Sequence, residues 1–496
     1  MFSKPRSVAW NTLVQIVAKA VGALAGLGMV VLLTRSLGDA GYGEYATVFA
    51  WVGVLIVFVD LGFYMTGLRE MSRRGADQAR IAGTLLTIKA VNAAAVAAVA
   101  ILAVRFMPYD VHVRGAIMLS LVGVAAVSLL DPFKSLFQVR LRMEPPSVAE
   151  ALGSLAALGA AVWLLLGRGA GLYAAVGCTV GGHVLALALT AAAALRVVRA
   201  RPGFDARIAA SLFRGALPLG LSGLLAVLYF RIDTLMLSWM RPLSDVGVYG
   251  ASYKILEAST VLPVLLLGTV FPLLTRAVQA GGTEQERCYR GTMETLVLLA
   301  VPMVAGGLAL AHELMLLVAG PAFVAPRLFD LPLAGPVALA SAPATFAVLL
   351  AGAPLIFLGQ LNGHMMLAAG RERALLALHL VIVPLNVALN LILISSYSFL
   401  GAAAATLVTE AVAIVITTVY VRRVTGMAPG AAPFLRALVA VVPMLLVVLW
   451  LEAHVLLRVL AGAACYGMVL RLAGWLPRLP EAKAGPVSSY DESKTA

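Results

Sequence analysis

Cysteine and charge are both scarce in this 496-residue chain. Its three cysteines, Cys178, Cys288 and Cys465, lie in separate segments without a CxxC spacing, so the sequence predicts neither a disulfide framework nor a zinc site. Only 12% of the residues are charged, whereas 61% are hydrophobic and the mean hydropathy is +0.96. A soluble domain cannot bury that much apolar surface. The composition therefore places the chain in a lipid bilayer.

Two sequence signals are also missing. There is no GxxxxGKS or GxxxxGKT loop that would bind ATP, and no convincing small-residue cleavage site follows the first apolar run, which we expect to remain as the first span. Runs of 20 or more apolar residues predict helices, because a helix satisfies its own backbone groups in lipid. The predicted fold class is an all-α polytopic membrane protein.

About fourteen spans are expected, and they suggest four regions. The first six spans run roughly over 8–34, 45–66, 81–106, 116–136, 147–166 and 171–198. The next six run over 216–240, 248–274, 292–311, 337–358, 374–396 and 400–421, and two more run over 435–451 and 455–472. The predicted regions are an N-terminal lobe (1–200), a C-terminal lobe (201–425), an extra helix pair (426–476) and a disordered cytoplasmic tail (477–496).

The placement of lysine and arginine supports this map, because cytoplasmic loops carry an excess of positive charge. With the N-terminus inside, 26 of the 37 basic residues fall in inner segments, and the alternation holds at every loop. Both termini are therefore expected in the cytoplasm. The net charge of +13 is explained by this topology and by attraction to an anionic inner leaflet, so no nucleic-acid partner is expected.

Short repeated motifs indicate two related halves. One motif recurs at an offset of 206 residues, as Arg35, Leu37, Asp39 and Gly41 and again as Arg241, Leu243, Asp245 and Gly247. A second recurs at an offset of 208, as Gly83, Thr84 and Thr87 and again as Gly291, Thr292 and Thr295. Two matches at nearly one offset favour a parallel duplication, an arrangement found in transporters.

Charged side chains inside the spans are the candidate functional residues, because one charge at the bilayer centre costs about 2.5–3.5 kcal/mol on insertion scales. The basic ones are Lys19, Lys89, Arg231 and Lys254. The acidic ones placed to bind and release an ion are Asp233 and Glu410. Residues two apart on a helix point about 200° away from each other, so Arg231 and Asp233 cannot neutralise one another along one face.

Several segments resemble one transporter family. The first span contains Asn11 and Gln15 and is followed by LTRSLGDAGYGEYA and VDLGFYMTGLRE. Further on come PLGLSGLLAVLYFRIDTLMLSWM, DVGVYGASYKI and LAAGRER. In this order and spacing, over most of the first 420 residues, the chain resembles the polysaccharide flippases (Wzx type) of the MOP superfamily. The extra helix pair departs from the many members with about twelve helices and matches the related lipid II flippases, which leaves the glycan open.

The resemblance implies a fold, a substrate and a location. The fold would be two six-helix lobes forming a V around a cationic cavity. The substrate would be a polyprenyl-pyrophosphate-linked oligosaccharide, such as an O-antigen, capsule or exopolysaccharide unit, flipped from the inner to the outer leaflet of the bacterial inner membrane. No cofactor and no enzymatic activity are implied, and the partners would be membrane lipid, the lipid-linked glycan and polysaccharide assembly proteins.

The task of such a protein suggests roles for the charged residues. A diphosphate needs a wet, positive route across the bilayer, and the four cations are spread over most of its thickness. We expect Lys19 and Arg231 to bind the diphosphate, with Lys89 and Lys254 along the route. Asn11 and Gln15 lie two turns and one turn before Lys19 on nearly the same helix face, and are expected to form a polar stripe with it.

Structural roles for the same residues remain open. Lys89 could snorkel to the inner surface, Lys254 could pair with Glu257 three residues on, and Arg231 could pair with a carboxylate of another helix. Asn11 and Gln15 could join helices. Without an ATP loop, we expect coupling to an H⁺ or Na⁺ gradient through Glu410 and Asp233, although Glu410 could instead form a fixed salt bridge.

Two other functions are weighed against the flippase. A MATE-like cation-coupled antiporter should have acidic pockets for cationic substrates, and the basic residues in the spans argue against it. A membrane glycan polymerase or ligase usually needs a large soluble loop or a catalytic cluster. The longest predicted outer connection, 319–336, holds only Arg327 and Asp330 as charged residues.

Overall fold

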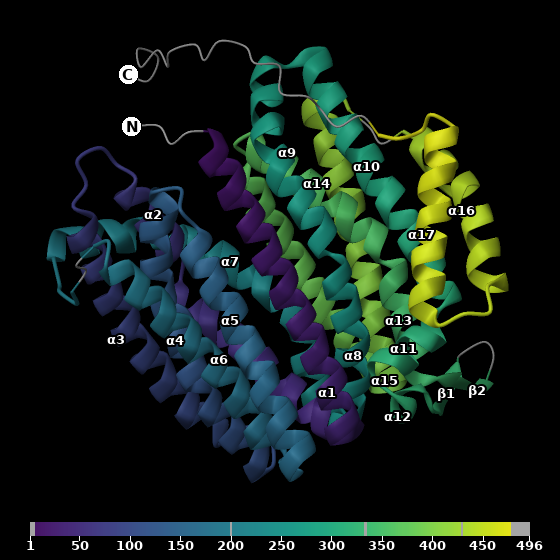
Figure 1. Ribbon diagram of the computed structural model, residues 1–496, viewed down its shortest axis with the longest axis horizontal. Coiled ribbons are helices and arrows are strands. Elements are labelled where there is room, and N and C mark those ends of the chain that lie inside the picture. The colour runs from purple at the N-terminus through teal and green to yellow at the C-terminus, as the bar shows by residue number, and fades with distance from the viewer. Residues whose placement is uncertain (1–4, 199–200, 332–334, 428–429, 478–496) are drawn as a thin grey trace. The chain divides into compact units, whose positions relative to one another are not determined.

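The computed structural model describes residues 5–198, 201–331, 335–427 and 430–477. Within these ranges, twelve helices are long and apolar enough to cross a membrane (Figure 1). Two of them, α1 (Pro5–Asp60) and α15 (Glu372–Thr425), are each two helices joined at a kink, at Gly38 and Ser398 respectively. Each therefore contains two predicted spans, which confirms the all-α polytopic fold. The predicted tail after 477 lies outside the described residues.

The chain divides into two compact units. Unit 1 comprises Met1–Ser259, Leu310–Gly352 and Leu376–Val412, and unit 2 comprises Thr260–Ala309, Ala353–Leu375 and Ala413–Ala496. Helix α15 passes from unit 2 into unit 1 and back again. The predicted division into lobes at 1–200, 201–425 and 426–476 stays a prediction.

Unit 1 contains most of the helices and a small hairpin. Its helices before the first boundary are α1, α2 (Phe63–Met71), α3 (Gln78–Val104), α4 (Val111–Val139), α5 (Glu144–Ala161) with the π-helical turn η1 (Val162–Leu166), α6 (Leu172–Leu195), α7 (Ala206–Met240) and α8 (Leu243–Ser259). Its second segment contains α11 (Ala311–Val318), α12 (Pro321–Val324), β1 (Pro326–Leu331), β2 (Gly335–Ala340) and α13 (Ser341–Ala351).

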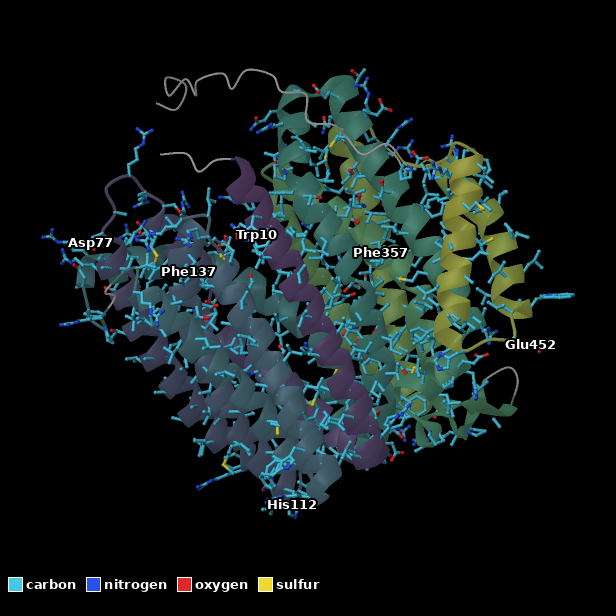
Figure 2. The ribbon with its side chains drawn as sticks, in the orientation of Figure 1. Trp10, Asp77, His112, Phe137, Phe357 and Glu452 are labelled. Atoms are coloured by element: carbon cyan, nitrogen blue, oxygen red, sulfur yellow. The ribbon has the colours of Figure 1, made fainter. Side chains whose placement is uncertain are left out.

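Unit 2 is a smaller group of helices. They are α9 (Val261–Ala280), α10 (Gly282–Ala309), α14 (Ala353–Ala368), α16 (Ala432–Trp450) and α17 (Val455–Leu472), together with the ends of α15. Each unit has its own buried aromatic residues, of which Phe137 of unit 1 and Phe357 of unit 2 are labelled in Figure 2.

The longest predicted outer connection contains regular structure that the sequence did not indicate. Strands β1 and β2 pair antiparallel, with Pro326 opposite Ala340 and Leu331 opposite Gly335. Pairing satisfies backbone groups that a loop would leave to water. The hairpin also fixes the backbone that carries Arg327.

The repeated motifs meet in unit 1. Arg327 forms ion pairs with both repeat-equivalent aspartates, Asp245 and, at 3.1 Å, Asp39. We call Asp39, Arg327 and Asp245 the aspartate clasp. The repeat-equivalent arginines also behave alike, because Arg35 donates to the carbonyl of Leu317 and Arg241 donates to that of Ile394. One basic residue thus joins equivalent positions of the two predicted halves.

Close backbone packing accompanies the aspartate clasp. A Cβ placed on Gly43 would lie 1.7 Å from the carbonyl oxygen of Leu243, and one on Gly247 would lie 2.0 Å from that of Asp39. Such distances are far below van der Waals contact, and the atoms that would have to move are backbone atoms. Only glycine therefore fits where these two segments cross.

We expect Gly43→Ala to destabilise the protein by about 1–3 kcal/mol, because overpacking would force the backbone of α8 away from α1. The measurement is the thermal unfolding midpoint in detergent. Gly177→Ala is the matched control, since no atom lies within 4 Å of a Cβ at that helical glycine, and alanine there should be neutral or slightly stabilising. Equal midpoints for the two variants would contradict this close packing.

Candidate functional site

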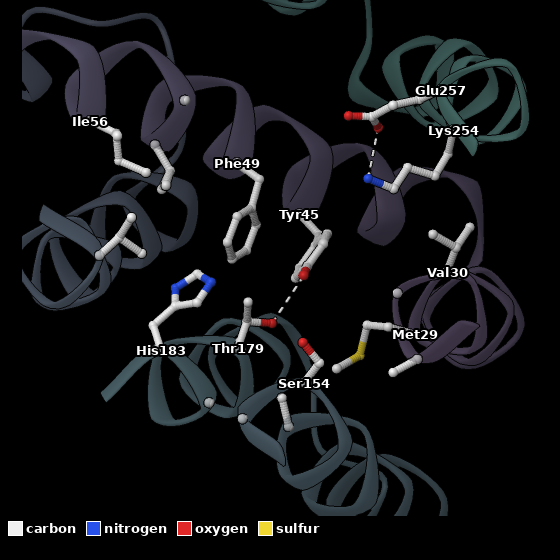
Figure 3. Close-up of a pocket in the computed structure, with 18 of the residues that line it drawn as sticks. Met29, Val30, Tyr45, Phe49, Ile56, Ser154, Thr179, His183, Lys254 and Glu257 are labelled. Atoms are coloured by element: carbon white, nitrogen blue, oxygen red, sulfur yellow. Dashed lines mark hydrogen bonds and ion pairs between the residues drawn. The ribbon is translucent and has the colours of Figure 1, made fainter. Parts of the chain in front are cut away.

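Unit 1 contains a cavity of about 570 Å³ whose lining comes from α1, α4, α5, α6, α7 and α8. The kink at Gly38 allows both arms of α1 to contribute, with 25–30 before the kink and 42–56 after it. Figure 3 shows Lys254 of α8 and Tyr45 of α1 among the residues that line this space. The cavity therefore brings together residues that are more than 200 positions apart in the sequence.

Aromatic rings cover part of the α1 wall. The rings of Tyr45 and Phe49 have centroids 4.5 Å apart, and those of Tyr42 and Tyr45 are stacked at 6.3 Å. The Tyr45 hydroxyl lies 3.0 Å from the Thr179 hydroxyl of α6 (Figure 3). Aromatic faces with hydroxyls nearby are suited to contacts with a partly polar ligand.

Three charged side chains from α7 and α8 form the most connected polar group in the lining. Lys254 Nζ lies 2.7 Å from Glu257 Oε2, and Arg231 Nη2 lies 3.6 Å from Glu257 Oε1. Their side chains are 34% (Arg231), 42% (Lys254) and 37% (Glu257) exposed, so all three can reach a ligand. The predicted pair between Lys254 and Glu257 is confirmed. The contact from Arg231 to Glu257 links α7 to α8.

The lining of this cavity carries both signs of charge. Its lining also contains Lys134, Glu150 and Asp131, and Lys134 Nζ lies 2.6 Å from Glu150 Oε1. Basic and acidic residues of the lining are thus equal in number, three of each. Charges in a low-dielectric environment are stable when they are paired, which explains why acidic partners accompany the basic residues.

Lys89 lies outside the cavity lining and does not snorkel. Its side chain is 0% exposed, and Nζ lies 2.7 Å from Asp60 and 2.5 Å from Asp131. A buried ammonium requires such partners, and two carboxylates supply them from α1 and α4. This interaction joins three helices behind the cavity wall, so the predicted place of Lys89 on the substrate route finds no support in its surroundings.

Asn11 and Gln15 make structural contacts. Asn11 donates to the carbonyl of Leu141 at 2.5 Å and accepts from the amide of Met143 at 3.1 Å, and so fixes the connection between α4 and α5. Gln15 donates to Asn11 Oδ1 at 3.3 Å. The alternative that Asn11 joins helices therefore agrees with its contacts, whereas Gln15 contacts Asn11 of its own helix.

Lys19 is exposed and lies on α1 before the first residue that lines the cavity, Ala25. The cavity-lining Gly26 and Val30 are seven and eleven residues further on, which places them on nearly the same helix face as Lys19. Among the described residues no carboxylate forms an ion pair with Lys19. Its predicted role in binding diphosphate remains a prediction.

The two predicted ion-binding carboxylates, Asp233 of α7 and Glu410 of α15, lie far apart in the sequence but belong to one polar cluster of unit 1. Asp233 is buried and accepts hydrogen bonds from Asn390 at 2.5 Å, from Thr406 at 2.6 Å and from Tyr249 at 3.1 Å. Asp233 is not among the residues that line the cavity, whereas Arg231 is, in agreement with the predicted divergence of these residues.

Glu410 accepts a hydrogen bond from Tyr229 at 2.7 Å. Within the described part of the chain neither Glu410 nor Asp233 has a salt bridge to a basic residue, so the alternative of a fixed salt bridge for Glu410 finds no support. The two carboxylates are instead surrounded by neutral hydroxyl and amide groups.

Sequence reasoning missed the neutral members of this cluster. Asn390 donates a hydrogen bond from Nδ2 to Asn386 Oδ1 at 3.0 Å, and the Oδ1 atom of Asn390 is buried without a hydrogen-bond partner. Two asparagines four residues apart in an apolar span are a signal that could have identified one polar helix face. The partners Tyr229, Tyr249 and Thr406 gave no such local signal.

Metal-binding clusters are also absent from the described ranges: no group of three or more His, Cys, Asp or Glu side chains could hold a metal ion. The polar cluster around Asp233 contains two such side chains, Asp233 and Glu410, together with neutral hydroxyl and amide groups.

Comparison with known structures identifies the fold. The lipid II flippase MurJ in an inward closed conformation is similar with a TM-score of 0.74 and 11% identity, over 93% of this chain and 98% of that chain. An inward-facing multidrug resistance MATE family transporter of the MOP superfamily has a TM-score of 0.64 and 14% identity, over 83% and 98%. A MOP superfamily transporter from Pyrococcus furiosus has a TM-score of 0.59 and 13% identity, over 84% and 95%.

Comparison of sequences identifies the family. No curated protein matches the chain significantly. Residues 8–278, more than half of the chain, match the family described as Polysaccharide biosynthesis protein. This match and the shared fold confirm the resemblance that the motifs indicated. The chain belongs to the polysaccharide biosynthesis protein family, in a fold shared with MOP superfamily transporters.

Proposed function

We propose that the protein flips a polyprenyl-pyrophosphate-linked oligosaccharide from the inner to the outer leaflet of the bacterial inner membrane, with both termini in the cytoplasm. The observation that carries this proposal is the pair of cations, Arg231 and Lys254, that line one cavity and share the single carboxylate of Glu257. Family membership and the flippase-like fold support a lipid-linked substrate.

The cavity suits the parts of such a substrate. Arg231 would bind two phosphate oxygens with its planar guanidinium, and Lys254 would add a point charge. The rings of Tyr42, Tyr45 and Phe49 would contact the sugar faces, while the prenyl chain stays in the bilayer. Lys19, two turns from the lining on the same face of α1, would attract the head group before it enters.

An ion gradient would drive alternating access through the polar cluster. Asp233 is buried beside the hydroxyl oxygens of Tyr249 of α8 and Thr406 of α15, and the Oδ1 atom of Asn390 is left without a hydrogen bond. Oxygen donors around one carboxylate suit a small hard cation, either Na⁺ or H⁺. Because α15 is kinked at Ser398, its two arms supply Asn390 and Thr406 separately, and an ion bound to both would bias their arrangement.

A MATE-like antiporter of small cations is the second candidate. It is supported by the fold shared with MATE transporters and by the acidic residues in the lining. Each of Glu150 and Glu257 already has a lysine within 2.7 Å, however, so neither is a free acceptor for a cationic substrate. We therefore favour the anionic substrate.

We expect Arg231→Ala and Lys19→Ala each to reduce export of surface glycan at least about tenfold, because a phosphate would lose a charge-assisted contact. Arg231→Lys should keep part of the activity, since it preserves charge but not two-point binding. The measurement is surface glycan in the parent bacterium deleted for this gene and complemented with each variant.

Arg290→Ala is the control for these variants, because Arg290 is exposed and pairs with Glu286 on its own helix, α10. Membrane levels of all variants are compared by immunoblot. Normal surface glycan from both Lys19→Ala and Arg231→Ala would refute the phosphate role.

We expect flipping of a fluorescent polyprenyl-diphosphate oligosaccharide in proteoliposomes to collapse when the driving gradient is dissipated. A sodium ionophore and a protonophore, added separately, distinguish Na⁺ from H⁺. Asp233→Asn and Glu410→Gln should reduce gradient-driven flipping at least about tenfold, because a neutral side chain no longer exchanges a cation. Glu286→Gln is the control carboxylate. Unchanged flipping after both gradients are dissipated would rule out ion coupling.

A further inference from the structure

Glu257 has an unusual position among the charged residues of the cavity, because it is a single carboxylate that faces two cations. One oxygen contacts Lys254 at 2.7 Å and the other lies 3.6 Å from Arg231. The first distance is a hydrogen-bonded ion pair, whereas the second is a charge contact without a hydrogen bond. Arg231 thus has an anionic neighbour but retains hydrogen-bonding capacity.

The two contacts also differ in how they are built. Lys254 and Glu257 are three residues apart on α8, so their pair stays intact when α8 moves as a whole. Arg231 is on α7, so its contact with Glu257 crosses between two helices. The longer contact is therefore the one that an entering anion can replace without disturbing the helix backbone.

The surroundings of Arg231 keep its side chain near this place. A Cβ on Gly53 of α1 would lie 3.2 Å from Arg231 Nε, so the glycine makes room for the guanidinium against the cavity wall. The carboxylate oxygens of Glu257 and the oxygens of a phosphate have the same hydrogen-bonding chemistry. Glu257 consequently occupies a place where a phosphate oxygen would bind.

We propose that Glu257 is a resident counter-ion, which stands in for the substrate phosphate in the empty cavity and is displaced from Arg231 when the phosphate binds. This inference rests on the proposed function. In the empty protein Glu257 stabilises Arg231 and Lys254, which would otherwise face a low-dielectric cavity unpaired. In the loaded protein it competes with the phosphate, so it weakens binding and favours release.

Glu150 provides a matched comparison in the same cavity. Its carboxylate pairs with one cation only, Lys134 at 2.6 Å, on the neighbouring helix α4. Replacing either glutamate by glutamine changes the cavity charge by the same amount. A general electrostatic effect would therefore be equal for the two variants, whereas a counter-ion at the phosphate site predicts an effect of Glu257 alone.

The test is binding of inorganic pyrophosphate to the full chain in lipid nanodiscs by calorimetry at two ionic strengths. We expect Glu257→Gln to bind about tenfold more tightly than the unsubstituted protein, with Glu150→Gln within about twofold of it. In proteoliposomes Glu257→Gln should lower both the KM for the lipid-linked substrate and the maximal flipping rate, because release becomes slower. Damage to the fold would weaken binding, so it cannot imitate this result.

Each outcome decides between the claims. Equal tightening in Glu257→Gln and Glu150→Gln, or no tightening in Glu257→Gln, overturns the counter-ion role. If Arg231→Ala binds pyrophosphate as well as the unsubstituted protein does, the proposed phosphate site itself fails. Loss of binding in Arg231→Ala with unchanged binding in Glu257→Gln leaves the site standing and rejects only the counter-ion. Glu257→Ala gives the same comparison if the glutamine variant does not accumulate.

Discussion

A charge inside an apolar helix bundle must have a partner, and this constraint organises unit 1. Lys89 is fully buried and is held by Asp60 and Asp131, which ties α3 to α1 and α4. The net stability gained from such an ion pair is small, because desolvation offsets much of the attraction, but removing one partner alone leaves a buried charge and is strongly destabilising. Partly exposed charges remain where the cavity is, and those are the ones able to exchange a protein partner for a ligand.

The aspartate clasp gives the predicted duplication a structural meaning. Asp39 and Asp245 occupy equivalent positions of the two repeats, and Arg327 pairs with both. Equivalent residues of a duplicated chain meet where the halves adjoin, so one arginine can satisfy two carboxylates there. Gly43 and Gly247, which are not equivalent in the repeat, pack the two segments together there, since each lies against the backbone of the other segment.

How much the sequence reveals depends on how far apart the interacting residues are. The helical spans follow from local hydropathy, and the pair of Lys254 and Glu257 follows from their spacing of three residues. The partners of Asp233 could not be predicted in this way, because Asn390 is 157 residues away in the sequence. The equal numbers of acidic and basic residues in the cavity could not be predicted for the same reason. Glu150 and Lys134, for example, are 16 residues apart in the sequence and lie on different helices.

The carboxylates of unit 1 differ chiefly in their neighbours, and this difference separates two tasks. Glu257 lies between two cations, so it would compete with an anion for them. Asp233 lies among asparagine, threonine and tyrosine side chains, where its charge lacks a basic partner within the described residues and a small cation would supply one. Helix α7 is connected to both carboxylates, because it carries Asp233 and also Arg231, which contacts Glu257. Arg231 and Asp233 are two residues apart and therefore lie on different faces of that helix. A rotation or shift of α7 would therefore act on the proposed phosphate site and the proposed ion site together, which is the mechanical link that the proposed gradient-driven flipping would require.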